Sequence, residues 1–280
     1  MNRHRALLFL VIASMFVLGT STRTASAFEW PVHEFNTEYN VSAGITAVLF
    51  ITTTTKKPWF VGLSEICNLG GSHPTDARDT ADYIESNLAN VGYSVSPQNY
   101  FSMIVASSAC PDPINGGNAP IGVLGYTRGP GIPSTVITYS NNPSGGTTEG
   151  AICAESSTYL GHIVACSTHL FNGSHSTAQA QAEELRNWGS FVYPGKKKVL
   201  LGDFNLRPPP PSVYGGTPVP QPFYDNYFEV DQSLNRPTRN TAIKNDFIFG
   251  AKNAFYGYGN VTITPLSYSD HYYFVGSFFS

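Results

Sequence analysis

The chain has 280 residues, of which 16 are Lys or Arg and 19 are Asp or Glu, so its formal net charge at neutral pH is −3. Its acidic balance argues against a protein that coats nucleic acid nonspecifically, because such binding depends on many Lys and Arg contacts to phosphates. Any nucleic-acid substrate must therefore be bound at a local site, through metal ions or a few cationic side chains. The one cationic cluster, residues 196–198, is explained equally well as the solvated start of a strand.

The N-terminus has the features of a secretory signal peptide. Arg3 and Arg5 precede an apolar run from Leu7 to Gly19, and a stretch of small residues ends at Ala27. The apolar run covers 13 residues, whereas a membrane-spanning helix needs about 20, so a membrane anchor is the weaker alternative. We therefore expect cleavage near Ala27, secretion without a stable membrane anchor, and one mature domain over residues 28–280.

Four cysteines, all downstream of this leader, point to disulfide bonds. An even number of cysteines in an oxidising compartment favours pairing, and the lack of Cys-x-x-Cys spacing argues against a zinc site. Cys153 and Cys166 flank a predicted hairpin, so the preferred pairing is Cys153–Cys166 with Cys67–Cys110. Three connectivities are possible, and the sequence does not choose among them.

Strands and helices are both predicted in the first two thirds of the mature chain. The first strand is expected around Phe35 and Asn36 and the second over Trp59–Ile66, whereas the apolar segment Gly44–Thr55 fits a helix or a strand equally well. Apolar residues at helical spacing predict helices over Thr75–Val91 and Thr177–Trp188.

The remaining apolar runs predict further strands, and Pro- and Gly-rich stretches between them predict loops. Residues 127–150 and 208–222 read as loops. The predicted strands are Tyr100–Ala106, Ile121–Tyr126, Ala151–Cys153, Leu160–His169, Val199–Leu201, Asp246–Gly250 and Tyr272–Phe279.

The stretch Lys198–Arg207 is the centre of the chain's organisation. Its continuous apolar run predicts a strand covered on both faces, which ends at Gly202 and is followed by Asp203 and Asn205. Ligands in α/β proteins bind at the carboxyl ends of strands, so this pair predicts a site. The alternative is an ordinary turn, because Gly, Asp and Asn all favour turns.

Polar residues stand at the ends of other apolar runs as well: Glu65, His169, Asp246, Asp270 and His271. Burying a carboxylate without a partner costs several kcal/mol, so Glu65 predicts a metal or a cationic partner, although an exposed strand end is the alternative. His169 alone would more often be a structural histidine. Carboxylates with two histidines and no thiolate site suit hydrolysis assisted by a hard cation, namely Mg²⁺, with Mn²⁺ or Ca²⁺ also suitable.

A phosphodiester is the substrate that most needs this set of groups. A cation offsets the charge that gathers on the phosphoryl oxygens, while a base activates water and an acid assists the leaving group. Histidine does both near neutral pH, and a carboxylate such as Asp246 can orient a base such as His271. A serine hydrolase is disfavoured, because the chain has no Gly-x-Ser-x-Gly nucleophile elbow.

Over residues 32–280 the order of five motifs resembles the endonuclease/exonuclease/phosphatase superfamily, which includes deoxyribonuclease I. The combination of Gly-Asp-Phe-Asn with a later Ser-Asp-His is its most specific part. The motifs are Leu63-Ser-Glu65, Ser167-Thr-His169-Leu, Gly202-Asp-Phe-Asn205, Lys244-Asn-Asp246-Phe-Ile and Ser269-Asp-His271. The resemblance implies an α/β fold with four layers, in which two mixed β-sheets pack face to face with helices outside.

The resemblance also implies roles for residues around a metal and a phosphate. Glu65 would bind a divalent metal together with Asn36 from the first strand. Asp270 would join that metal site or hold the second histidine. Asn118, in a Gly-Asn pair, is similar to a family motif near the phosphate, although an ordinary loop is the alternative.

The catalytic set that the resemblance implies has five members. His169 would contact the scissile phosphate as an acid or a transition-state donor. Asp203 and Asn205 would position water, phosphate or a metal, and Asp246 would orient His271, the general base. The chain departs from the family pattern elsewhere, since Ser64 replaces a common glutamine and the arginine often found before Gln181 is absent.

Three functions remain open at this point. The leading one is a secreted, monomeric, metal-dependent nuclease that cleaves extracellular DNA. The second is a phosphoesterase acting on a lipid or inositol substrate, such as a sphingomyelinase or phosphoinositide phosphatase, for which exposed aromatic residues at Tyr224, Tyr227 and Phe228 would meet lipid. The third is a binding protein that keeps the fold without turnover.

Overall fold

The computed structural model describes residues 28–68, 80–94, 100–111, 118–128, 131–143, 148–158, 161–209 and 216–280. The predicted signal peptide, residues 1–27, lies outside these ranges, so it stays a prediction. Among the described helices, none is long and apolar enough to cross a membrane.

Within the described residues, the larger of two mixed β-sheets has seven strands. Its order is β12-β13-β1-β2-β5-β3, with β4 paired to β5 beside this path. β1 and β2 are parallel and the other neighbours are antiparallel. The strands are β1 (Glu29–Asn36), β2 (Phe60–Cys67), β3 (Tyr93–Ser94), β4 (Tyr100–Pro111), β5 (Asn118–Arg128), β12 (Gly257–Pro265) and β13 (Tyr272–Phe279).

The second sheet has six strands in the described part of the chain, in the order β10-β11-β9-β8-β7-β6. β8 and β9 are parallel, and the remaining pairs are antiparallel. The strands are β6 (Gly131–Thr138), β7 (Gly150–Thr158), β8 (Gly161–His169), β9 (Lys197–Asp203), β10 (Tyr227–Glu229) and β11 (Asp246–Ala251).

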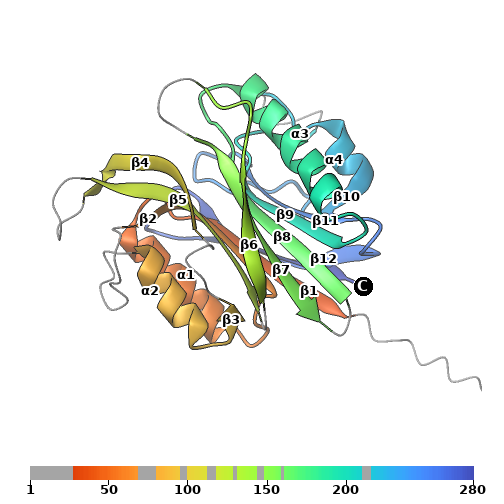
Figure 1. Cartoon of the computed structure of the whole chain (residues 1–280), viewed down its shortest axis with the longest axis horizontal. Coiled ribbons are helices and arrows are strands. Elements are labelled where there is room, and N and C mark those ends of the chain that lie inside the picture. The colour runs from red at the N-terminus through yellow and green to blue at the C-terminus, as the bar shows by residue number, and fades with distance from the viewer. Residues whose placement is uncertain are drawn as a thin grey trace, which may run out of the picture.

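Helices cover the outer faces of both sheets, which makes four layers (Figure 1). α1 (Val41–Thr53) and α2 (Thr80–Ala89) pack on the larger sheet, and α3 (His175–Val192) and α4 (Gln221–Asn226) lie on the smaller one. The predicted fold class, a four-layer α/β sandwich with two mixed sheets face to face, is therefore confirmed.

The core between the two sheets explains why the strand sequences are apolar on both faces. One buried cluster joins Trp30, Val32 and Phe60 of the larger sheet to Leu201 and Ile248 of the smaller sheet. Other side chains of the same strands pack instead against the helices. The central strands β1, β2, β9 and β11 therefore bury both of their faces, as a continuous apolar run requires.

The ambiguous segment 44–55 is mostly helical, as part of α1. The side chain of Asn40 caps this helix, because its Oδ1 accepts hydrogen bonds from the backbone N–H groups of Ser42 and Ala43 at 2.9 and 3.3 Å. Such a cap satisfies backbone donors that have no partner within the helix. Asn40 thus has a structural role, while Asn36 ends β1.

Four of the described strands were not predicted from the sequence: the short β3 and β10, and the longer β6 and β12. β6 lies within residues 127–150, so the interpretation of that whole stretch as a loop is wrong. β6 is an edge strand, where a residue such as Pro133 is tolerated because one side of the strand needs no pairing. β12 is an edge strand of the larger sheet. It was missed because its half-buried sequence contains no apolar run.

The aromatic residues proposed as a lipid-facing surface are a further correction. Tyr224 and Tyr227 are each only 4% exposed. Both belong to the cluster of buried side chains around α3, α4 and the smaller sheet. Phe228 is half-buried. These residues form part of the core because aromatic side chains bury large apolar areas.

Both preferred disulfides are present. Cys153 and Cys166 face each other across β7 and β8 with Cα atoms 4.0 Å apart. Cys67 at the end of β2 is bonded to Cys110 in β4 with a Cα separation of 5.7 Å. The expected connectivity is therefore confirmed.

Candidate active site

Polar side chains from several strand ends meet at one edge of the sandwich. β1 ends at Asn36, β8 at His169 and β9 at Asp203. The sheet register places His169 and Asp246 on the two sides of Asp203. His271 precedes β13, which is the antiparallel neighbour of β1. The topology thus brings together side chains that are far apart in the sequence.

The backbone at the end of β9 needs a glycine. Gly202 has φ +136°, and a Cβ atom there would lie 1.9 Å from the carbonyl oxygen of Thr168. Asn205 also has a positive φ, +49°, which Asn tolerates better than most residues. Its backbone N–H donates to Asp203 Oδ1 at 2.8 Å, and its Nδ2 donates to the Leu170 carbonyl at 2.8 Å. The turn therefore holds Asp203 in place.

Asp203 is the shared carboxylate of the site. Its Oδ2 accepts a hydrogen bond from Asn36 Nδ2 at 3.2 Å. The same oxygen lies 3.6 Å from His271 Nε2 and 3.8 Å from His169 Nε2. Asp203 is 2% exposed. Both predicted catalytic histidines therefore point their Nε2 atoms at one buried carboxylate.

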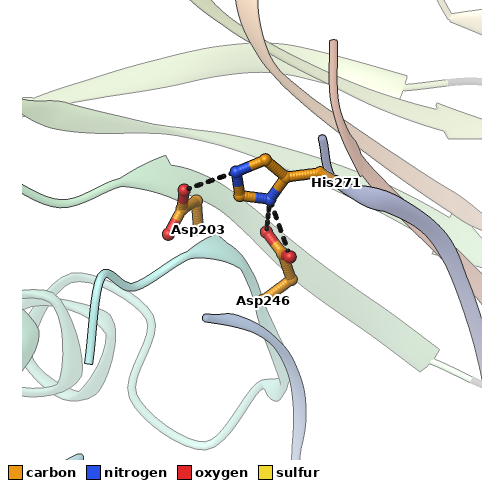
Figure 2. Close-up of side chains that lie close together, drawn as sticks. All are labelled: Asp203, Asp246 and His271. Atoms are coloured by element: carbon orange, nitrogen blue, oxygen red, sulfur yellow. Dashed lines mark hydrogen bonds and ion pairs between the residues drawn. The ribbon is translucent and has the colours of Figure 1, made fainter. Parts of the chain in front are cut away.

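His271 is held by a second carboxylate. Its Nδ1 donates to Asp246, at 2.9 and 3.0 Å from the two oxygens (Figure 2). Burial lowers the pKa of His271, but Asp246 and Asp203 outweigh burial and raise it above its usual value. The hydroxyl of Thr238 accepts hydrogen bonds from the backbone N–H groups of Asn245 and Asp246, both at 3.1 Å.

The side chains of Asp203, Asp246 and His271 also form a group that could hold a cation. One ligand atom from each lies within 4.8 Å of the others, and all three residues are buried. Burial raises the pKa of Asp246, the charge of Asp203 adds to this effect, and His271 opposes it. The sequence predicted catalytic roles for the same three residues. A cation bound here would therefore lie next to the groups expected to transfer protons.

Glu65 contacts the same nitrogen of His169, Nε2, that faces Asp203. It occupies an irregularity in the pairing of β2 with β5 and has φ +56°. Its Oε1 accepts a hydrogen bond from His169 Nε2 at 3.1 Å. Burial raises the pKa of Glu65, but the hydrogen bond and charge of His169 outweigh it, so the pKa is below its usual value. The predicted cationic partner of Glu65 is thus a histidine within the protein.

His169 has a further acidic neighbour that the sequence did not indicate. Its Nδ1 lies 3.5 Å from Oε2 of Glu149, a buried residue just before β7. Burial lowers the pKa of His169, but Glu149, Glu65 and Asp203 raise it well above its usual value. Glu149 stands in a Gly-rich stretch without a recognisable motif, so only the pairing of β7 with β8 reveals it.

Asp270 lies beside the second histidine. Its Oδ1 is 3.4 Å from His271 Nε2, and its Oδ2 forms an ion pair with Arg239. The backbone N–H of Asp270 donates to Glu38 Oε2 at 3.0 Å. Asn36, expected to share the metal with Glu65, uses its Oδ1 to accept from the Glu38 backbone N–H at 2.8 Å.

The expected phosphate-binding residue, Asn118, is placed only by its backbone. It begins β5, opposite Pro111 of β4. Its side chain lies outside the described part of the structure, so its role stays a prediction.

Glu34 is another residue that sequence reasoning missed. It is fully buried, and neither of its carboxylate oxygens has a hydrogen-bond partner. Burial raises its pKa well above the usual value, and Asp246 and Asp203 raise it further. Glu34 is two residues before Asn36, and alternate residues of a strand share a face. This spacing could have indicated that Glu34 lies on the same side of β1 as the predicted metal ligand Asn36.

Comparisons with known proteins identify the fold. No protein-family model and no curated protein sequence matches this chain. Among solved structures, an endonuclease/exonuclease/phosphatase from Beutenbergia cavernae is 19% identical with a TM-score of 0.62, and the match covers 90% of this chain and 71% of that one.

Two further structures have similar scores. The human Nocturnin catalytic domain with a bound sulfate anion is 17% identical with a TM-score of 0.61, over 91% of this chain and 97% of that chain. Truncated Caenorhabditis elegans TDP2 is 16% identical with a TM-score of 0.60, over 90% and 98%. The described protein therefore has the fold of the endonuclease/exonuclease/phosphatase proteins.

Proposed function

We propose that this protein is a secreted, metal-dependent phosphodiesterase that cleaves DNA. The observation that carries the proposal is the arrangement around Asp203, where two buried histidines meet one carboxylate and each is held from behind by another. Asp246 binds Nδ1 of His271, and Glu149 lies beside Nδ1 of His169. A phosphodiester needs both an acid and a base, and paired histidines supply them near neutral pH.

The residues present fit a hard divalent cation. Carboxylate and amide oxygens are the ligands that Mg²⁺, Mn²⁺ and Ca²⁺ prefer. Asp270 Oδ1 is buried without a hydrogen bond, which leaves an acceptor available. Asp246 gives both of its oxygens to His271. We therefore assign the cation to Asp203 and Asp270, with Glu65 and Asn36 as further ligands. When bound, such an ion offsets negative charge on the phosphoryl oxygens.

The two histidines would then have different tasks. His169 is surrounded by carboxylates that raise its pKa well above the usual value, which favours its protonated form and suits it to donate to the phosphate or the leaving oxygen. His271 would accept a proton from the attacking water at Nε2, because its Nδ1 is occupied by Asp246. Asp246 stabilises the imidazolium that results.

Features outside the catalytic centre support the choice of substrate and location. Two disulfides fit an oxidising compartment. The Nocturnin structure, which has the same fold, holds a sulfate, a tetrahedral anion like phosphate. With Tyr224 and Tyr227 buried, no aromatic surface at those positions favours a lipid substrate.

Plasmid cleavage by the purified secreted chain tests this function. We expect nicking in magnesium or magnesium plus calcium and none with chelator. His271→Ala and Asp203→Asn should each lower the rate by about 10²–10⁴, the contribution of a positioned acid or base. The matched controls are His162→Ala, at the start of β8, and Asp225→Asn, in α4; both residues lie outside the cluster around Asp203, so both variants should keep full activity.

The same samples distinguish the alternatives. Hydrolysis of bis(p-nitrophenyl) phosphate with an intact plasmid would mean a phosphodiesterase with another substrate, to be sought among sphingomyelin and phosphoinositide vesicles. Absence of metal-dependent hydrolysis of every diester would contradict the proposal. Circular dichroism of each variant checks that lost activity does not come from unfolding.

A further inference from the structure

We infer that Arg207 and Arg239 form an anion subsite beside the Asp246–His271 pair, which binds a second phosphate group next to the scissile phosphodiester. The inference rests on the proposed phosphodiesterase function and specifies its substrate. Neither arginine belongs to the five motifs that carry the family resemblance.

Arg207 is a half-buried cation with no carboxylate partner in the described part of the structure. Its backbone is fixed, because its N–H donates to Thr217 at 2.9 Å and its carbonyl accepts from Val219 at 2.8 Å. One guanidinium nitrogen, NH1, donates to the side chain of Asn245 and to the Leu206 carbonyl. Its Nε is buried without a hydrogen-bond partner. The charge of Asp203 acts on Arg207 without a direct ion pair, so the guanidinium keeps donor capacity that an anion can use.

Arg239 approaches from the adjacent loop. It forms an isolated antiparallel bridge with His271, and its NH2 is paired with Asp270. Its Nε is also buried without a hydrogen-bond partner. Arg239 is thus held against the same histidine that we propose as the base, with donor capacity left over.

The two arginines are anchored to one small region. Arg207 binds Asn245, the residue before Asp246, while Arg239 is the bridge partner of His271, and Asp246 and His271 are hydrogen-bonded to each other. Consistent with this closeness, burial lowers the pKa of Arg207, the charge of Asp203 opposes this effect, and the charge of Arg239 adds to it. Two guanidinium groups repel each other, and an anion between them would remove that repulsion.

The chemistry of arginine indicates what the subsite binds. A guanidinium does not exchange protons near neutral pH, so these residues cannot act as acid or base, but they match phosphate oxygens with a planar fork of donors. A single phosphodiester carries one negative charge, which His169 and the cation already oppose. Two further cations fit a substrate with an additional phosphate, as in a polynucleotide strand.

Ligand binding tests the subsite without requiring turnover. Thymidine 3′,5′-bisphosphate and thymidine 5′-phosphate differ by one phosphate, and titration calorimetry gives the affinity of each. We expect the wild type to bind the bisphosphate at least about tenfold more tightly. Arg207→Ala and Arg239→Ala should bring this ratio close to one, and Arg207→Lys should keep part of it. The control Arg186→Ala, on α3, should leave the ratio unchanged.

Turnover provides the second comparison. The substrates are thymidine 5′-(p-nitrophenyl phosphate) and its 3′-phosphorylated form, and the subsite predicts that the arginine variants lose more kcat/KM on the second. Equal losses on both substrates, or an unchanged binding ratio, would overturn the inference. If the binding ratio responds as expected but neither ester is hydrolysed, the anion subsite stands and the proposed reaction fails. Inorganic pyrophosphate, added as a competitor, separates recognition of a nucleotide from recognition of free phosphates.

Discussion

His33 and Glu34 are adjacent on β1, both are buried, and neither belongs to the motifs of the site. His33 faces the helices, where its Nδ1 is hydrogen-bonded to the hydroxyl of Tyr273 at 2.7 Å. Burial lowers the pKa of His33 to about 3. Glu34 has the opposite response to burial, because removal from water disfavours its charged form. His33 is therefore neutral in the folded protein at neutral pH, and burial favours the neutral form of Glu34.

The first prediction at this scale concerns the acid stability that His33 controls. Its pKa is about 3 in the folded protein and about 6.5 in an unfolded chain. Below pH 6.5 the unfolded chain gains a proton that the folded chain does not, so the free energy of unfolding falls as the pH falls. The expected loss is about 1.4 kcal/mol per pH unit, or about 2 kcal/mol at pH 5.

Urea unfolding at pH 7, 6 and 5 measures this loss. His33→Gln keeps a hydrogen-bonding side chain that does not titrate, and its unfolding free energy should fall less steeply over this range than that of the wild type. The control His162→Gln changes a histidine whose side chain is 55% exposed, and it should keep the wild-type slope. Identical slopes for wild type and His33→Gln would disprove the assignment.

At the scale of elements, β9 shows how a strand presents its catalytic end. Val199 and Leu201 pack between the sheets while Leu200 faces α3, so the strand is anchored on both sides. The chain then passes Thr168 so closely that Gly202 has room for no side chain. Asp203 follows at once. The position of the shared carboxylate thus depends on the packing of β9 against β8.

Gly202→Ala tests this dependence. An added Cβ would overlap the Thr168 carbonyl and disfavour φ +136°, so the neighbouring strands must move apart. We expect a destabilisation of about 2–5 kcal/mol from backbone strain and overpacking together, with activity falling further than stability. Gly257→Ala in β12 meets no atom within 4 Å and is the matched control. Thermal unfolding and diester hydrolysis measure both effects, and wild-type values for Gly202→Ala would refute the argument.

The whole molecule is a sandwich in which each of the two sheets contains one disulfide bond. Cys67–Cys110 connects strands of the larger sheet and closes a segment with a sequence separation of 43, whereas Cys153–Cys166 closes one of only 13 within the smaller sheet. A disulfide restricts the unfolded chain more when the closed loop is longer. The two bonds should therefore differ in their effect on stability.

Removing each pair of cysteines measures that difference. The double variant Cys67→Ala/Cys110→Ala should lose about 4 kcal/mol of unfolding free energy, and Cys153→Ala/Cys166→Ala about 3 kcal/mol. Guanidinium unfolding gives both values, and wild type in reductant serves as the reference for loss of both bonds. A larger loss for the shorter loop would show that packing around Cys153 and Cys166 outweighs chain entropy.

Local patterns predicted most of this architecture. The apolar runs ending at Asp203 and His169 correctly indicated buried strands, and the cysteine positions favoured the pairing that is present. The edge strand β6 escaped because its sequence resembles a loop, and segment 44–55 was ambiguous because an apolar run alone does not distinguish helix from strand. Edge strands depend on partners that lie elsewhere in the chain.

The sequence by itself determined the residue types of the site and their place at strand ends, because these follow from local runs and from the order of the motifs. Only the tertiary structure decided which groups meet. Glu149 joins His169 because β7 pairs with β8. Arg239 joins His271 across a bridge, and Glu34 lies under the carboxylates with no partner for its oxygens. Electrostatic effects depend on distance and burial, and both are set by contacts between distant segments.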